Sequence, residues 1–112
     1  MTEVGTASGS FALDEAHEHR WVLTGEIDID VHARFREVWA PGRTAEEAVR
    51  IDMTDVTFLD SSGLRILYDA IKASPDGEKP QLVAVPERAR WIIDVTGLTS
   101  LFDFQDGPDS GE

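Results

Sequence analysis

The sequence predicts an α/β fold: a mixed, mostly parallel sheet of four to five strands, helices packed against it, and an N-terminal β-hairpin. Alternating apolar residues at 49–53 are typical of a strand with one buried face. An apolar stripe at 64–71, spaced i, i+3, i+4 and i+7, indicates an amphipathic helix after it. Strand and helix patterns run along the chain in the order β-β-α-β-α-β-α-β, which favours parallel pairing beyond the opening hairpin.

The N-terminal part predicts a hairpin. Residues 1–10 are small and polar, and we expect a disordered arm there. Weak alternation at 11–15 and an apolar run at 21–24 predict two strands, and residues 16–19 read as the turn between them. The folded domain is therefore expected to span residues 11–104, and the acidic segment 105–112 is expected to be a disordered tail.

A first helix is predicted over about 31–39. Val31, Phe35 and Val38 are spaced i, i+4 and i+7, and the Pro41-Gly42 pair ends the pattern. Asp28 or Asp30 can cap the helix, because a short carboxylate accepts hydrogen bonds from first-turn amides.

The central segment predicts a strand, a connector, a tight turn and a second helix. The strand covers 49–53, the connector 54–59 and the turn 60–63, and the helix continues to about Ala73. Asp60 or Ser61 can cap this helix, and Gly63 allows a close turn of the backbone.

The last part predicts a strand, a helix and a short final strand. After a loop at 74–78, residues 81–85 form the strand, 87–95 the helix and 101–104 the final strand. Gly97 is suited to the left-handed residue that follows a helix, and Leu98 can cover the helix end.

Size and composition restrict the possible functions. A chain of 112 residues forms one domain with one core, and the absence of cysteine excludes disulfides, thiol catalysis and thiolate metal sites. No apolar run reaches the ~18 residues of a membrane span, and the N-terminus lacks a signal-peptide core. We therefore expect a cytoplasmic protein with no membrane partner.

The net charge of −12 bears on the class of partner. Such a charge repels phosphate backbones, so we expect no nucleic-acid partner. An acidic surface suits a basic protein partner, although acidity also serves solubility alone.

The sequence carries no catalytic motif. The chain lacks a Gly-x-Ser-x-Gly elbow and a glycine-rich phosphate loop. His17 and His19 are expected on a solvated hairpin turn and His32 on the surface of the first helix, which is a poor set for a metal. We expect no enzyme activity, no metal and no cofactor.

Ser61 is the candidate for chemistry. At a helix N-terminus its hydroxyl is exposed beside unpaired amides, and a phosphate there gains from the helix dipole. Capping of the helix by Ser61 is the plainer alternative.

The ten residues 55–64, Asp-Val-Thr-Phe-Leu-Asp-Ser-Ser-Gly-Leu, resemble the signature of STAS domains, and in particular that of anti-sigma-factor antagonists (anti-anti-sigma factors). Residues 23–28 resemble the strand and loop before the first helix of that family, and 96–98 with 101–102 resemble its last helix end and strand. The resemblance implies the STAS fold over the whole predicted domain.

The resemblance also implies a function called partner switching. The unphosphorylated protein would bind an anti-sigma factor that is a serine kinase, and a sigma factor is thereby freed. Phosphorylation of Ser61 would end the binding, and a serine phosphatase would restore it. The partner-binding residues would be Asp28, Asp60, Ser61, Ser62, Gly63 and Leu64, with Ser62 either buried or capping. The alternatives are a STAS scaffold subunit of a stress-sensing assembly and an accessory subunit of a lipid-transport ATPase.

Overall fold

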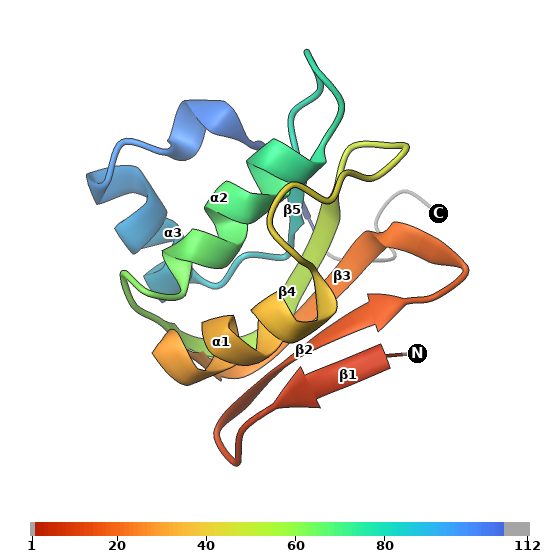
Figure 1. Ribbon diagram of the computed structural model, residues 1–112. Helices are drawn as coiled ribbons and strands as arrows, with labels where there is room; N and C mark the ends of the chain where they lie inside the picture. Colours follow the sequence, from red (N-terminus) through yellow and green to blue (C-terminus); the bar gives the residue numbers. More distant parts are fainter. Residues whose placement is uncertain (1, 107–112) are drawn as a thin grey trace.

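The strands of the sheet lie in the order in which they occur in the chain (Figure 1). The computed structural model describes residues 2–106. Its sheet has six strands: β1 (Thr2–Gly5), β2 (Gly9–Asp14), β3 (His17–Ile27), β4 (Arg50–Leu59), β5 (Gln81–Val83) and β6 (Asp103–Gln105). The pairs β1–β2 and β2–β3 are antiparallel, and the other three pairs are parallel. The predicted α/β architecture, with its mixed sheet and N-terminal hairpin, is confirmed.

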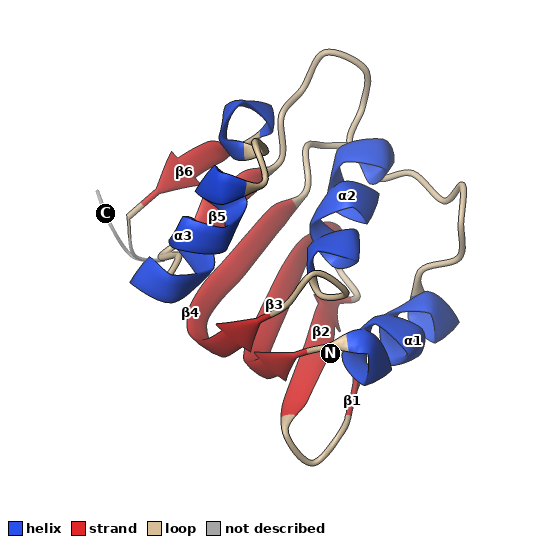
Figure 2. Ribbon diagram, turned by 90° about the vertical axis from the view of Figure 1, so that its left-hand side faces the viewer, coloured by secondary structure: helices blue, strands red, loops and turns tan. Residues whose placement is uncertain are grey.

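All three α-helices cover the same face of the sheet, as Figure 2 shows. They are α1 (Ile29–Val38), α2 (Leu64–Ala73) and α3 (Glu87–Val95), and a short 3-10 helix, η1 (Thr99–Leu101), follows. Each α-helix joins two neighbouring parallel strands, and each crossover steps in the same direction across the sheet. Because such crossovers are nearly always right-handed, the three helices come to one side. No helix within residues 2–106 is both long and apolar enough to cross a bilayer.

The N-terminal segment differs from the prediction. Residues 2–5, expected in a disordered arm, form the edge strand β1, and β2 begins at Gly9 rather than at residue 11. β1 pairs antiparallel with β2 from Thr2–Leu13 to Gly5–Ser10, and Val4 packs against the core. Backbone pairing with β2 and one apolar contact stabilise this strand, although its composition is typical of a linker. With β1 the sheet has six strands, rather than the four to five predicted. Of the predicted tail, Gln105 ends β6 and residues 107–112 lie outside the described part.

The central strand is longer than expected. Residues 54–59, predicted as a connector, belong to β4, which pairs with β3 along its length. The register between the two strands shifts twice, between Val22 and Thr24 and between Gly25 and Glu26 of β3. Side chains of a regular strand point alternately to the two faces of the sheet, and the bulges interrupt this alternation in β4. Val56 and Leu59 are therefore both buried although they are three positions apart.

Three other boundaries also differ. Residues 17–19 begin β3, so the hairpin turn lies at residues 15–16. β5 ends at Val83, because Ala84 adopts a left-handed backbone with φ 55°. The final strand occupies 103–105 because η1 takes residues 99–101.

The ends of two helices match the sequence prediction. The Asp28 carboxylate accepts hydrogen bonds from the amides of Asp30 and Val31, both at 3.1 Å, and is the N-cap of α1. After α3, Gly97 has φ 79° and Leu98 is buried against the helix end.

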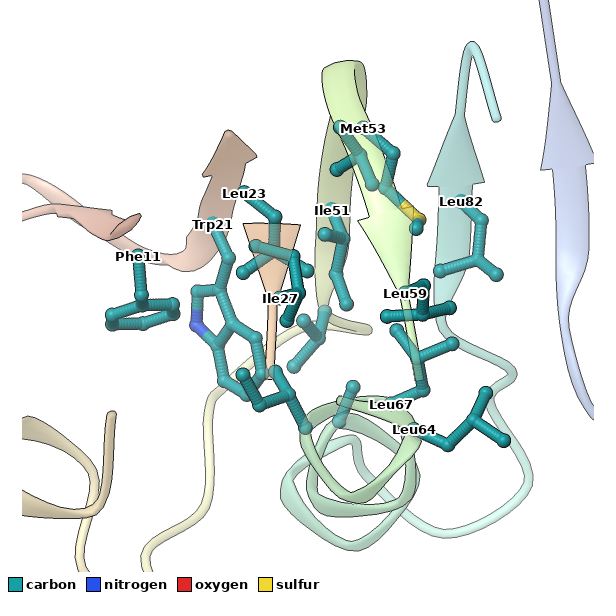
Figure 3. Packing of buried hydrophobic residues seen from close by; sticks show 14 of the residues in the cluster. Phe11, Trp21, Leu23, Ile27, Ile51, Met53, Leu59, Leu64, Leu67 and Leu82 are labelled. Carbon is teal, nitrogen blue, oxygen red and sulfur yellow. The ribbon is translucent and has the colours of Figure 1, made fainter. Parts of the chain in front are cut away.

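The core lies between the sheet and the helices (Figure 3). Near α1, four aromatic rings pack edge to face, with centroids 4.9–5.4 Å apart; they belong to Phe11, Trp21, Phe35 and Trp39. Beneath α2, Leu67 is fully buried and lies near Leu59 and Leu64. This layer fixes α2, and therefore the turn before it, on the end of β4.

A partly buried ionic cluster joins α1 to α2. The Asp69 side chain accepts from the Arg36 guanidinium at 3.0 Å, and its other oxygen lies 3.3 Å from His32 Nε2. His32 was expected on the surface, yet only 12% of its side chain is exposed. The expectation was wrong because its partner on α2 is 37 positions away and no local pattern marks it.

Replacing Leu67 by alanine is expected to lower the free energy of unfolding by ~2 to 5 kcal/mol, because the truncated side chain leaves a cavity in a closed core. Urea denaturation measures the change. The control is Tyr68→Ala on the same helix, where 47% of the side chain is exposed and a small loss is expected. Equal, negligible losses for both variants would mean that α2 does not pack as described.

Candidate functional site

The candidate site lies where two neighbouring parallel strands end. Ile27, the last residue of β3, pairs with Leu59, the last residue of β4. Asp28 and Asp60 come directly after these residues, and the Asp60 amide donates to the Ile27 carbonyl at 3.4 Å. The structure therefore brings together two predicted site residues that are distant in the sequence.

Asp60 holds the turn that leads into α2. Its carboxylate accepts a hydrogen bond from the Gly63 amide at 2.8 Å, and its carbonyl accepts one from the Leu64 amide at 3.1 Å. The carboxylate thus satisfies an amide that would otherwise lack a partner at a helix start. Asp60 therefore caps the turn before α2, whereas the helix itself begins after Gly63 without a side-chain cap, and Ser61 caps neither.

Gly63 lies against the end of β3. Its φ of −64° suits any residue, so the need for glycine comes from space. A Cβ at this position would lie 2.3 Å from the Ile27 carbonyl oxygen and 2.7 Å from Leu59 Cδ1. This close contact between the Gly63 backbone and the end of β3 sets the position of the turn relative to the sheet.

The variant Gly63→Ala is expected to destabilise the domain by ~1 to 3 kcal/mol, because the carbonyl contacted by the added methyl cannot move without disturbing the strand ends. Thermal unfolding would register the loss. Ser62→Ala serves as the control, since the Ser62 side chain makes no hydrogen bond within residues 2–106 and little change is expected. A Gly63→Ala protein as stable as the control would show that the turn is not held this closely.

Ser61 is exposed at the start of the turn. Within the described residues its hydroxyl makes no hydrogen bond, and the amides of Ser61 and Ser62 have no acceptor. A free hydroxyl beside two free amides at a helix start is accessible to a partner and is favourable for an anion.

The other predicted contact residues have different surroundings. Ser62 is half-buried, so it is neither buried nor capping as expected. The Leu64 side chain is 5% exposed and belongs to the core, and Gly63 is buried beneath the turn. Leu64 and Gly63 therefore support the site from the core side. Of the predicted contact residues, a partner can reach Asp28, Asp60, Ser61 and part of Ser62.

An apolar hollow beside Ser61 was not predicted. It has a volume of about 490 Å³, and its lining comes from the end of β4, the turn and α3: Phe58, Leu59, Asp60, Ser61, Arg88, Trp91 and Ile92. The sequence carried one signal for it, because Trp91 lies outside the apolar side of the 87–95 helix, which carries Ala89, Ile92 and Ile93. Phe58 gave no such signal, because the bulge before it hides which way it faces.

Within residues 2–106, no histidine is placed beside Ser61 to act as its base. A serine nucleophile needs a base within hydrogen-bond reach. His19 precedes Ile27 by eight strand positions, or roughly 26 Å at the usual rise per residue, and His32 faces Asp69. Within residues 2–106, no group of three histidine, aspartate or glutamate side chains is placed to hold a metal ion.

The chain is similar to one protein family and to several named bacterial proteins. The model of the STAS domain family matches residues 21–110. An anti-sigma-B factor antagonist of Staphylococcus epidermidis is 29% identical over 85 residues, which cover 74% of this chain and 79% of the relative. The protein of the same name in Bacillus subtilis is 29% identical over 90 residues, covering 80% and 83%. The one in Listeria monocytogenes is 27% identical over 85 residues, covering 74% and 75%.

Proposed function

The chain belongs to the STAS domain family, and from this premise we propose that it is an anti-sigma-factor antagonist that acts by partner switching. In its unphosphorylated form it binds an anti-sigma factor that is also an ATP-dependent serine kinase, and a sigma factor is released. The kinase phosphorylates Ser61, the complex dissociates, and the sigma factor is captured again. A serine phosphatase restores the binding form, and the cycle takes place in the cytoplasm.

The observation that carries the proposal is the Ser61 hydroxyl, exposed and free of hydrogen bonds among the described residues, on a turn whose backbone is fixed by Asp60 and Gly63. A kinase needs an accessible hydroxyl held in one place, because phosphoryl transfer depends on alignment. The relatives support the same role: those that match over three quarters or more of their length are named anti-sigma-B factor antagonists. This favours an antagonist over a scaffold subunit or a transport accessory.

Phosphorylation at this position acts on the interface more than on the fold. The phosphate gains ~0.3 to 1 kcal/mol from the helix dipole, so the domain stays folded. It adds about −1.5 to −2 charges beside the carboxylate of Asp60, at the edge that also carries Asp28. A partner shaped for a neutral hydroxyl then loses contact and meets added charge. A penalty of ~2.8 kcal/mol already weakens binding a hundredfold.

The proposal is tested by incubating the purified protein with candidate serine kinases and ATP, and then locating the phosphate by mass spectrometry. We expect one phosphate, on Ser61. A phosphate mainly on Ser62 or Thr57 would show that Ser61 is not the acceptor. Failure of every serine kinase of the source cells to modify the protein would contradict the proposed function.

A further inference from the structure

The hollow beside Ser61 has no role in the phosphorylation cycle described above. Its floor and walls are apolar, from Phe58, Leu59, Trp91 and Ile92, and Asp60, Ser61 and Arg88 complete its lining. Because Ser61 itself lines it, the hollow and the phosphoacceptor form one continuous surface.

Large apolar side chains are exposed at this hollow. Half of Phe58 and 65% of Trp91 are accessible to water, and Val95, one turn further along α3, is 58% exposed. Removal of apolar surface from water is favourable, so covering these two aromatic rings with a partner would contribute to binding. Contiguous exposed apolar surface is typical of binding sites, and contacts with other proteins are among them.

We propose that the hollow receives an apolar side chain of the kinase that phosphorylates Ser61, and that a carboxylate of the kinase next to that side chain pairs with Arg88. This inference rests on the proposed function, because it takes the kinase as the occupant. A standard protein interface covers ~800 Å² on each partner, which is a patch of roughly 16 Å radius. A kinase centred on Ser61 therefore covers the hollow, and an unfilled hollow would hold water against Trp91.

The charge of the lining is the reason for expecting a kinase carboxylate at Arg88. Arg88 is the one basic residue of the hollow, is exposed, and has no ion pair within residues 2–106. The chain as a whole carries a net charge of −12, so its surface otherwise favours basic groups on a partner. A kinase carboxylate at Arg88 would fix the orientation of docking, since a guanidinium binds a carboxylate through two parallel hydrogen bonds. Tryptophan and arginine are also the residues most enriched among those that dominate interface energies.

The interface with the kinase would then have two parts with different roles. The turn at Ser61 carries the switch, and the hollow supplies affinity that is independent of the reacting atoms. Loss of the hollow contact should therefore raise KM for phosphorylation and leave kcat unchanged, because it removes binding shared by ground state and transition state.

The test uses the full chain and the purified kinase found to phosphorylate Ser61. Affinity by calorimetry and the kinetics of phosphorylation are measured for Trp91→Ala, Phe58→Thr and Arg88→Glu. Leu101→Ala is the matched control, because Leu101 is 40% exposed on η1 and does not line the hollow. Thermal unfolding confirms that each variant is folded, and threonine at 58 retains a residue suited to a strand.

We expect Trp91→Ala and Arg88→Glu each to weaken binding at least about tenfold and to raise KM by a similar factor, with kcat unchanged. Leu101→Ala should bind within about twofold of wild type. If the hollow variants bind as tightly as wild type while Ser61 is still phosphorylated, the inference is wrong and the proposed function stands. Equal losses in the hollow variants and the control would also overturn it. If no kinase modifies wild-type Ser61, the proposed function itself fails.

Discussion

Replacing Ser61 by aspartate is expected to weaken binding of the anti-sigma kinase by about a hundredfold or more. The carboxylate places a negative charge, next to Asp60, where the partner meets a neutral hydroxyl in the wild type. Calorimetric titration of the kinase with wild type and Ser61→Asp would measure the difference.

The same variant should remain as stable as wild type to within about 1 kcal/mol, because a helix N-terminus tolerates an acid. This separates a change of the interface from a change of the fold, and thermal unfolding provides the control. Indistinguishable affinities for the two proteins would refute the proposal that charge at this position ends binding.

Replacing Ser61 by alanine is expected to abolish phosphorylation while binding to the kinase is retained. The hydroxyl is the only group removed, and among the described residues it makes no hydrogen bond, so the turn keeps its shape. In the cell such a protein would hold the anti-sigma factor permanently and leave the sigma factor active.

Ser62→Ala is the matched control for this experiment, because it removes the neighbouring hydroxyl from the same turn. Phosphorylation, followed by intact mass after incubation with kinase and ATP, should proceed normally in the control. Continued phosphorylation of Ser61→Ala would show that another residue is the acceptor.

Local signals in the sequence were sufficient for the parts of the fold that depend on neighbouring residues. The cap at Asp28, the burial of Leu64 and Leu67 and the left-handed Gly97 all follow from chemistry within a few positions. The predicted stripe of α2 was wrong at Tyr68, which is 47% exposed, because the buried face of the helix turns toward Ile66 and Ala70 instead. The turn at 60–63 was predicted for the same reason, because Asp60 or Ser61 can cap a first turn and Gly63 allows a close turn of the backbone. The structure then showed that the Asp60 carboxylate accepts from the Gly63 amide.

Features that depend on distant pairing could not be predicted in this way. β1 is a strand because β2 lies beside it, and β4 continues past Met53 because bulges accommodate residues that break the alternation. The pairing of His32 with Asp69 and the hollow between β4 and α3 arise only when separate elements come together. Of the candidate site, the sequence therefore supplied Ser61, the proposed phosphoacceptor, and the two carboxylates of Asp28 and Asp60. The structure added Phe58, Arg88 and Trp91.

The most direct measurement compares the affinity of the kinase for two forms of the natural chain, one unmodified and one carrying a phosphate on Ser61 alone. Protein phosphorylated to completion is separated by ion exchange and verified by mass spectrometry, and each form is titrated with kinase and ADP. We expect the unmodified form to bind at least about a hundredfold more tightly, with both forms equally folded. Equal affinities would contradict the account, because the exposed hydroxyl would then not control the partner.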